Sequence, residues 1–340
     1  MLTEVVFTVG RASSSQLEEL VEAGGSMARL TFSFGTSETQ SRRASRLRQL
    51  ADSGHHQLRI AGELEGQRLR VGRIERDGAE DDLVVDGGST YEFRDVAVAE
   101  TLNKSQFIPV PGLSSMSLAP GDVIVYGDNR CEFEICYIDG AQIVAKARSS
   151  DVITSTRSMV VANKPIPSFR FDERNIEQAK FILRNDLFDF LMLPAIADIE
   201  PVQEALGLIE HCGRQVGLIA KIGTRIDGPI MKDIARICDY VVIDRSDLAL
   251  CYGSHSVPAL IDQILIDFAG FREKLLIASQ IANAASQGIS GNMSAPEVSD
   301  IWRLMKDGVG GFVLAEETAV DGNGISALEQ TSALVRCFSD

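Results

Sequence analysis

The strongest constraint in this sequence is an alternation of short apolar, β-branched runs with amphipathic segments of helix length. Such alternation is typical of parallel α/β folds, because each helix carries the chain back to the start of the next strand. Eight runs have the length and composition of strands: Glu4–Thr8, Met27–Phe32, Gln57–Gly62, Phe188–Leu193, Val216–Lys221, Tyr240–Asp244, Leu275–Ser279 and Gly311–Ala315. Eight β/α units predict a closed (β/α)8 barrel, the TIM-barrel fold.

One interval breaks the alternation, since the stretch between Gly62 and Phe188 is far too long for a single helix. It contains short alternating runs broken by Gly, Asp and Asn, such as LRVGRIERDG and GDVIVYGDNR, which are typical of antiparallel hairpins. We therefore expect a small all-β domain inserted after strand 3. Residues 1–70 and 161–340 would form the barrel, and residues 71–160 the insertion. Asp172 is expected to cap a helix over Glu173–Asn185 that leads into strand four.

Composition excludes several classes of function. The chain has 340 residues and a net charge of −15, and this charge argues against binding to nucleic acid or to an anionic membrane. The N-terminus has no basic segment followed by an apolar one, as a signal peptide would, and no apolar run is long enough to span a membrane, so we expect a cytoplasmic protein. The six cysteines form no C-x-x-C pair and the four histidines form no ligand motif with them, which favours buried packing thiols over a zinc site.

Polar residues gather where the predicted strands end, and a barrel of this kind carries its catalytic groups at that rim. They include arginines, one lysine and several carboxylates: Thr8, Arg11, Arg29, Thr31, Ser33, Glu63, Glu65, Arg70, Lys221, Asp244, Arg245, Asp247, Ser279, Gln280, Glu316, Glu317 and Thr318. This mixture suits an anionic substrate held beside a divalent cation. A single Arg or Glu at a rim is often only a loop salt bridge. Lys221 is a stronger candidate, because it closes the apolar run GLIAK, where an unused charge would be costly to bury.

The same segments resemble the pyruvate kinase family. FTVGRASSSQLEELVEAGGSMARLTFSFGTSE is similar to the opening barrel segment of that family, and IAGELEGQRLRVG, LIAKIGTRIDG, VIDRSDLAL, IASQI and LAEETA follow in the same order at strand spacing. The resemblance runs from about Thr3 to Ala319. The predicted insertion falls where the family carries its lid domain. Because the sequence stops at Asp340, we expect the C-terminal regulatory domain of the family to be missing.

The resemblance implies roles for individual residues. Lys221 would contact the transferred phosphoryl group and the enolate oxygen, Arg29 a phosphate, and Ser279 the surroundings of the methylene carbon; these three are the expected catalytic residues. The expected substrate-binding residues are Arg29, Arg70, Arg245, Ser246, Asp247 and Ser279, with Arg70 near the nucleotide phosphates. The expected ligands of Mg2+ or Mn2+ are Asp247, Glu63, Asp244 and Ser33. Lys221 and Asp247 should face the same pocket.

Several positions depart from the family pattern. The second metal-binding glutamate of the family falls at Gly223, and Asp244 stands where the family has alanine. The potassium ligands Asn, Ser, Asp and Thr correspond to Thr31, Ser33, Glu63 and Leu64, which gives little support for bound K+. On the nucleotide side, Phe34 replaces a histidine and Glu65 a lysine. The half of the site that would hold the small acid is the better preserved.

Three functions are compatible with these residues. The first is a glycolysis-related transferase, a pyruvate kinase-like phosphotransferase that uses phosphoenolpyruvate or pyruvate, a nucleotide and a divalent metal. The second is a carbon–carbon lyase or condensing enzyme that keeps a metal-bound pyruvate enolate. The third is a non-catalytic binding protein on the same fold, because fold alone does not determine function. A homo-oligomer formed through the barrel helices is compatible with each of them.

Overall fold

The structure is a computed structural model, and it describes residues 3–10, 13–54, 56–76, 79–100, 107–127, 131–140, 142–155, 157–164, 166–286, 291–319 and 323–339. The chain divides into two compact units. The first comprises Met1–Gly66, Pro167–Ala249 and His255–Asp340, and the second comprises Gln67–Ile166 and Leu250–Ser254. The sequence-based boundaries 1–70, 71–160 and 161–340 stay predictions of the domain limits. Each unit has its own core and is described separately.

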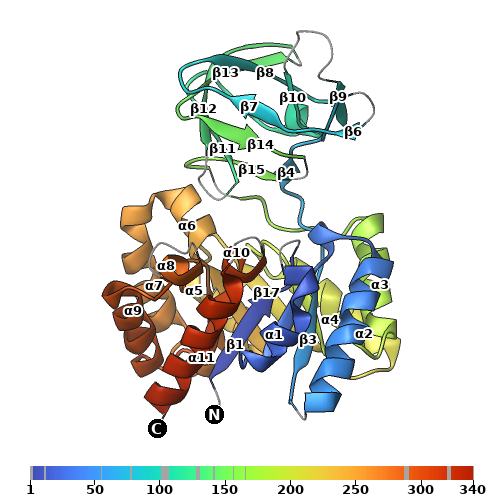
Figure 1. Cartoon of the computed structure of the whole chain (residues 1–340), viewed down its shortest axis with the longest axis vertical. Helices are drawn as coiled ribbons and strands as arrows, with labels where there is room; N and C mark the ends of the chain where they lie inside the picture. The colour runs from blue at the N-terminus through green and yellow to red at the C-terminus, as the bar shows by residue number, and fades with distance from the viewer. Residues whose placement is uncertain are drawn as a thin grey trace. The chain divides into compact units, whose positions relative to one another are not determined.

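Eight parallel strands close into a ring in the first unit (Figure 1), which confirms the predicted (β/α)8 barrel. In ring order the strands are β1 (Glu4–Thr8), β2 (Met27–Thr31), β3 (Arg59–Glu63), β16 (Phe190–Leu193), β17 (Gly217–Ile222), β18 (Tyr240–Asp244), β19 (Leu275–Ala278) and β20 (Gly311–Leu314). The ring closes where β20 pairs with β1, with Gly311 opposite Glu4. Because all eight strands are parallel, their C-terminal ends meet at one rim.

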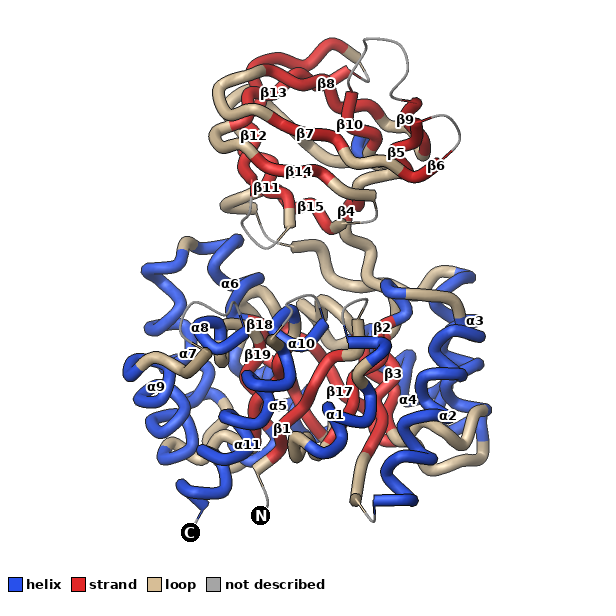
Figure 2. The backbone as a smooth tube through the Cα atoms, viewed as in Figure 1, coloured by secondary structure: helices blue, strands red, loops and turns tan. Residues whose placement is uncertain are grey.

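Helices surround the strand ring (Figure 2). The α-helices are α1 (Leu17–Glu22), α2 (Ser37–Gly54), α3 (Glu173–Arg184), α4 (Glu200–Cys212), α5 (Gly228–Ile237), α6 (Arg245–Tyr252), α7 (Val257–Asp267), α8 (Asn283–Ser286), α9 (Ala295–Lys306), α10 (Glu316–Ala319) and α11 (Gly324–Ser339). Short 3-10 turns are η1 (Ser13–Ser15), η2 (Phe32–Phe34), η3 (Leu113–Ser115), η4 (Ser254–Ser256) and η5 (Arg272–Lys274). No helix in the described ranges is long and apolar enough to cross a membrane.

The strands read as continuous apolar runs because helices cover the outside of the ring and side chains fill its inside. Every residue of β1, β16, β19 and β20 is buried. Each of the eight strands sends at least one apolar side chain into a common interior cluster: Val6, Met27, Ala61, Phe190, Met192, Ile219, Val242, Leu276, Ala278 and Val313. The barrel is therefore a filled core, and its chemistry is confined to its rims.

Strand β3 ends one residue later than the sequence indicates, and the difference concerns a site residue. The predicted strand ended at Gly62, with Glu63 after it. In the structure Glu63 belongs to the strand, since it lies opposite Thr31 of β2 and Met192 of β16. Glu63 is consequently fixed by the barrel itself, and only 3% of it is exposed.

The helix before β16 begins where the sequence predicts. Asp172 caps α3, and its Oδ1 accepts a hydrogen bond of 2.7 Å from the backbone N–H of Asn175. A side-chain oxygen at this position satisfies one of the N–H groups that the first helical turn leaves without a partner. The helix ends at Arg184, one residue before the predicted Asn185.

The second unit is built of strands and short turns (Figure 2). A seven-stranded sheet has the order β10 (Phe107–Pro109), β8 (Thr90–Arg94), β13 (Gln142–Ala147), β12 (Cys131–Asp139), β11 (Val123–Tyr126), β15 (Ser158–Val161) and β4 (Leu69–Arg70). Two smaller sheets pair β14 (Asp151–Ile153) with β7 (Leu83–Val85), and join β6 (Ala79–Glu80), β5 (Arg73–Arg76) and β9 (Val98–Glu100). The unit has its own aromatic core, in which the Phe93 and Phe133 rings lie edge to face at 5.1 Å.

Candidate active site

Lys221 lies at the centre of a buried group of charged side chains at the C-terminal rim of the barrel. Its ammonium Nζ lies 3.3 Å from Oδ2 of Asp244, 3.8 Å from Oε1 of Glu63 and 4.0 Å from Oδ2 of Asp247. Its side chain is 10% exposed. The expected juxtaposition of Lys221 and Asp247 is therefore present, and two further carboxylates share the same cation. We call these four residues, together with Arg29, the rim cluster.

Glu63 lies between the two cations of the rim cluster. Its Oε2 accepts hydrogen bonds from Nε and Nη2 of Arg29, at 3.1 and 2.6 Å, and Nη1 of Arg29 donates to Oγ1 of Thr8 at 3.1 Å. Burial alone would raise the pKa of Glu63, but the charges of Arg29 and Lys221 hold that pKa below its usual value. Glu63 is therefore ionised. Its other oxygen, Oε1, is buried and has no hydrogen-bond partner among the described residues.

Asp244 joins three elements of the rim. It is the last residue of β18, and its Oδ1 accepts hydrogen bonds from the backbone N–H groups of Ser246 (3.1 Å) and Asp247 (3.3 Å), at the start of α6. The same oxygen accepts a hydrogen bond of 3.0 Å from the hydroxyl of Ser279. Asp244 thus caps a helix, holds a hydroxyl from the end of β19 and pairs with Lys221.

Asp247 packs against the backbone at Gly223. A side chain at Gly223 would place its Cβ 2.4 Å from Cβ and 2.6 Å from Oδ2 of Asp247, distances that real atoms do not adopt. The first carbon of the glutamate that the family carries at this position would overlap the Asp247 side chain. The change at Gly223 and the placement of Asp247 are therefore linked, and the Asp247 side chain is only 2% exposed.

Arg245 holds the backbone that follows β19. Its guanidinium donates to the carbonyl of Ser279 at 3.1 and 2.9 Å, to the carbonyl of Gln280 at 2.7 Å, and to the carboxylate of Asp300 on α9. Ser279 and Gln280 both have left-handed backbone conformations, with φ of 69° and 57°. Such conformations are costly for residues other than glycine and persist where the surroundings fix them. Arg245, expected as a substrate ligand, thus also fixes the rim backbone.

The structure does not bring every expected residue to the rim cluster. Ser246 contributes its backbone N–H to Asp244, as described above. Ser33, in η2, donates its own N–H to Oγ1 of Thr31 at 3.3 Å. Arg70 belongs to the second unit, where it lies opposite Ser158 of β15. Arg11 and the Glu316 side chain lie outside the described residues.

Two rim residues show features that sequence reasoning did not reveal. Burial raises the pKa of Glu317, although hydrogen bonds from backbone N–H groups, including those of Ile281 (3.2 Å) and Ala315 (2.8 Å), act in the opposite direction. Glu317 therefore ties the loop after β19 to the end of β20. Asp300 was not among the expected residues, because nothing in the sequence around it marks a partner 55 positions away.

The oxygen donors of the rim cluster suit a divalent cation only in part. Among the described residues, Glu63 Oε1 is a buried carboxylate oxygen without a hydrogen bond. The carboxylates of Glu63 and Asp247 both lie within 4.0 Å of the ammonium of Lys221. Mg2+ and Mn2+ prefer such oxygen ligands. Within the described ranges, however, no three His, Cys, Asp or Glu side chains form a ready metal site. The donor set therefore fits a cation whose coordination is completed by substrate oxygens and water.

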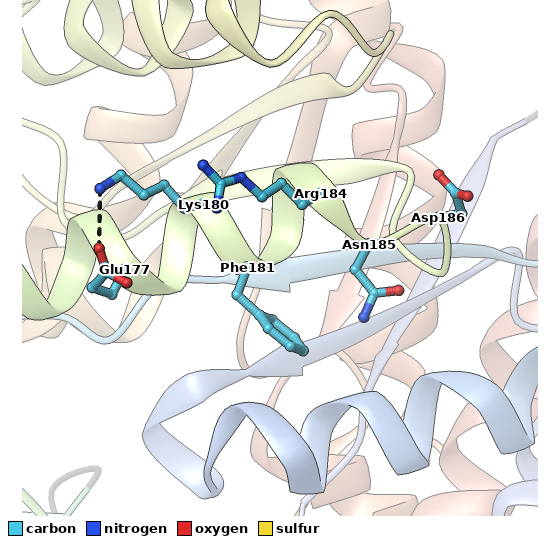
Figure 3. A pocket seen from close by; sticks show the side chains of 6 residues that line it. All are labelled: Glu177, Lys180, Phe181, Arg184, Asn185 and Asp186. Carbon is cyan, nitrogen blue, oxygen red and sulfur yellow. Dashed lines mark hydrogen bonds and ion pairs between the residues drawn. The ribbon is translucent and has the colours of Figure 1, made fainter.

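A surface cavity of about 620 Å3 lies along α3 and shares no residue with the rim cluster. Figure 3 shows Glu177 and Lys180 paired on the helix surface, and Phe181 pointing away from them. The Phe181 ring packs on Phe32 and Phe188, at centroid distances of 6.1 and 6.2 Å. This cavity is therefore lined by an exposed ion pair and by a phenylalanine that packs against other aromatic rings.

The rim cluster contains three carboxylates and two fixed cations in a site shielded from water. Its residues come from β2, β3, β17, β18 and the first turn of α6, so that the barrel, not a loop, sets their positions. Cations held in advance at such a site stabilise negative charge that develops on a bound reactant. The arrangement is suited to reactions in which charge moves between an anionic group and an oxygen.

Comparison with known proteins gives a consistent result. The family model described as "Pyruvate kinase, barrel domain" matches residues 1–326. The chain is 25% identical to a pyruvate kinase of Encephalitozoon cuniculi over 324 residues, which are 94% of this chain and 72% of that protein. It is 22% identical to the pyruvate kinase of Thermococcus litoralis, covering 98% of this chain and 69% of that protein. The crystal structure of pyruvate kinase from Pyrobaculum aerophilum matches with a TM-score of 0.75, 23% identity, and coverage of 98% of this chain and 73% of that one.

Proposed function

This chain belongs to the pyruvate kinase family, and from that premise we propose that it transfers a phosphoryl group between phosphoenolpyruvate and a nucleoside diphosphate. The observation that carries the proposal is the buried ammonium of Lys221, held among Glu63, Asp244 and Asp247 at the C-terminal rim of the barrel. Burial of an ammonium is costly, and here three carboxylates compensate it at the rim where barrels of this kind carry their catalytic groups.

In this proposal the residues of the chain bind and position the reactants. The bond between phosphorus and the enol oxygen breaks, a bond forms to the terminal phosphate oxygen of the nucleotide, and the enolate takes a proton at its methylene carbon to give pyruvate. Lys221 and Arg29 stabilise the charge that moves between the phosphoryl group and the enol oxygen. Ser279 lies beside the methylene carbon, while Arg245, Ser246 and the backbone of Asp247 shape the pocket for the small acid.

Glu63 and Asp247 are the proposed ligands of Mg2+ or Mn2+, with Asp244 and Ser33 as further candidates. The cation would supply Lewis-acid neutralisation of the phosphoryl and carboxylate oxygens. Arg70 is proposed to contact the nucleotide phosphates, the second unit to act as a lid, and the protein to work in the cytoplasm.

A coupled assay tests the proposal directly. Purified protein is given phosphoenolpyruvate and ADP, and pyruvate is followed through lactate dehydrogenase as NADH is consumed. We expect turnover with Mg2+ or Mn2+ that the Lys221→Met variant does not show. The assay is repeated with and without K+. Absence of turnover above the Lys221→Met background, over this range of metals, would overturn phosphoryl transfer with these substrates.

A second candidate function follows from the nucleotide side of the site. Glu65, where the family has a lysine, pairs through its carboxylate with Arg174 at 2.5 Å. An enzyme that forms a pyruvate enolate without a nucleotide would use only the preserved half of the site. Metal-dependent exchange of the pyruvate methyl protons in D2O, followed by NMR without nucleotide, would favour this function. Exchange that needs a nucleotide would argue for the kinase instead.

A further inference from the structure

Four hydrogen-bond donors of the rim converge on one carboxylate of the protein itself. The N–H groups of Ser246 and Asp247, at 3.1 and 3.3 Å, and the hydroxyl of Ser279, at 3.0 Å, all donate to Oδ1 of Asp244. The ammonium of Lys221 lies 3.3 Å from its Oδ2. These donors come from α6, from the residue that follows β19, and from β17. Donors of these kinds bind small oxoanions, and here Asp244 accepts from all four.

We propose that Asp244 occupies, as an internal ligand, the donors that the proposed function gives to the small acid, so that a substrate or product carboxylate must compete with Asp244 to bind. The identity of the natural competitor, a carboxylate of the substrate or product, depends on the proposed function. The evidence that Asp244 occupies these donors is independent of it and consists of the contacts of Asp244. Asp244 thereby lowers the affinity of the chain for small acids.

A helix cap by itself does not account for this arrangement. Asp172 caps α3 in the ordinary way, and its Oδ1 accepts hydrogen bonds from the backbone N–H and the side-chain amide of the nearby Asn175. Asp244 has in addition a hydroxyl and an ammonium from two other elements of the barrel. Hydrogen bonds from a cation and from helix N–H groups are those that bind free carboxylates.

One buried oxygen of the rim cluster also lacks a hydrogen bond from the described residues. Glu63 Oε1, 3.8 Å from the same ammonium, is a buried oxygen with no hydrogen-bond partner among the described residues, although its side chain is only 4% exposed. Buried polar atoms normally have a partner. Because Glu63 Oε1 and Asp247 Oδ2 lie 3.8 and 4.0 Å from the ammonium of Lys221, displacement of Asp244 does not leave that ammonium without a counterion.

Replacement of Asp244 by alanine tests the inference with acetate as the probe. Acetate supplies the carboxylate that the alanine variant lacks, on a single methyl carbon. Thermal unfolding is measured as sodium acetate replaces sodium chloride at constant ionic strength. We expect the unfolding midpoint of Asp244→Ala to rise with acetate, and pyruvate to bind this variant at least about tenfold more tightly than wild type by calorimetry, the factor that one charge-assisted hydrogen bond supplies.

Two variants serve as controls. Asp172→Ala removes an N-cap aspartate far along the chain from the rim cluster, and its midpoint should not respond to acetate beyond the wild-type response. Asp244→Asn keeps the shape of the side chain, so it should respond little. An equal rise in Asp172→Ala, or no rise in a folded Asp244→Ala, would overturn the inference.

If Asp244→Ala does not fold in chloride, its yield on refolding in acetate replaces the midpoint. Recovery in acetate supports the site, and lack of recovery opposes it. The test needs neither nucleotide nor metal. A protein without kinase activity can therefore still show the carboxylate site, and an active kinase can lack it.

Discussion

At the scale of the residue, Lys221 balances three carboxylates that have little access to water. We expect Lys221→Met to lose activity by about 10^3-fold or more. It should also lower the free energy of unfolding by about 3–5 kcal/mol at neutral pH, because removal of one partner leaves buried charges uncompensated. The loss should be smaller at pH 4, because without Lys221 the pKa of Glu63 is no longer held as far below its usual value and the carboxylate can take up a proton. Urea unfolding at both pH values measures it.

The matched control for that variant is Lys232→Met on α5, where the lysine is exposed. It should change neither activity nor stability beyond about 0.5 kcal/mol. A similar loss in both variants would mean that the buried charge of Lys221 contributes no more to activity or stability than the charge of an exposed lysine.

Glu63 gives a prediction about pH. Its pKa is held below the usual value by Arg29 and Lys221 against the effect of burial. Ionised Glu63 therefore stabilises the fold above the unfolded-state pKa of about 4.3, and this contribution is lost as pH falls through the lower folded-state pKa. We expect Glu63→Gln to be much less stable than wild type at pH 7 and nearly equal to it at the acid end.

Chemical denaturation between pH 7 and the acid limit of folding tests this pH dependence. Glu177→Gln is the control, since Glu177 forms an exposed ion pair with Lys180 on α3. That pair should contribute at most about 0.5 kcal/mol at any pH. A constant difference between Glu63→Gln and wild type across the pH range would contradict the expectation.

At the scale of the element, the end of β17 and the start of α6 meet where Gly223 has no side chain. A Cβ there would force Asp247, and the first turn of α6 with it, to move. We expect Gly223→Ala to lower stability by about 1–3 kcal/mol and to reduce activity, because overpacking shifts the rim cluster. Gly223→Glu should therefore fail to restore the metal ligand of the family unless Asp247 is changed as well.

Gly207→Ala on α4 is the matched control, since a Cβ there meets no atom within 4 Å. Alanine in a helix interior is favoured over glycine by about 0.5–1 kcal/mol, so this variant should be slightly more stable than wild type with unchanged activity. A Gly223→Ala protein as stable and active as Gly207→Ala would show that Asp247 moves freely.

The elements of the barrel could be predicted because apolar runs at regular spacing follow directly from the burial of parallel strands. The place of Lys221 and Asp247 at one rim followed from their positions at and after two strand ends, and the family resemblance implied that they share a pocket. The hydrogen bonds from Arg245 to the carbonyls of Ser279 and Gln280 could not be predicted. They depend on the direction of a long side chain, whose guanidinium also pairs with Asp300. The overlap of Asp247 with a side chain at Gly223 likewise needs coordinates.

At the scale of the whole molecule, the two rims of the barrel have different roles. The N-terminal rim carries its own partly buried network: Tyr240 donates to Oε1 of Glu4 at 3.1 Å, Arg59 donates to Tyr240 at 3.0 Å and pairs with Glu4, and Ser26 donates to Glu4 at 2.6 Å. These groups join β1, β3 and β18 at the end of the barrel opposite the rim cluster. In barrels of this type that end serves stability.

We expect Tyr240→Phe to lower the free energy of unfolding by about 1 kcal/mol, the value of a typical intramolecular hydrogen bond, and to leave kcat and KM unchanged. Denaturation and steady-state kinetics on the same sample measure both. A fall in kcat without a fall in stability would contradict the division of roles between the rims. Ser279→Ala, at the opposite rim, should lower kcat, and it should also lower stability by about 1 kcal/mol because its hydroxyl donates to the buried Asp244.

The closure of the ring has a consequence for the synthesis of the protein. The backbone N–H of Thr8 donates to Oγ1 of Thr318, a partner 310 positions later, and β1 pairs with β20 along the same seam. On the ribosome, one edge of β1 must remain without its neighbour until nearly all of the chain has emerged. During that interval the nascent chain exposes an apolar strand edge, the kind of surface that chaperones bind and that aggregates when they are scarce.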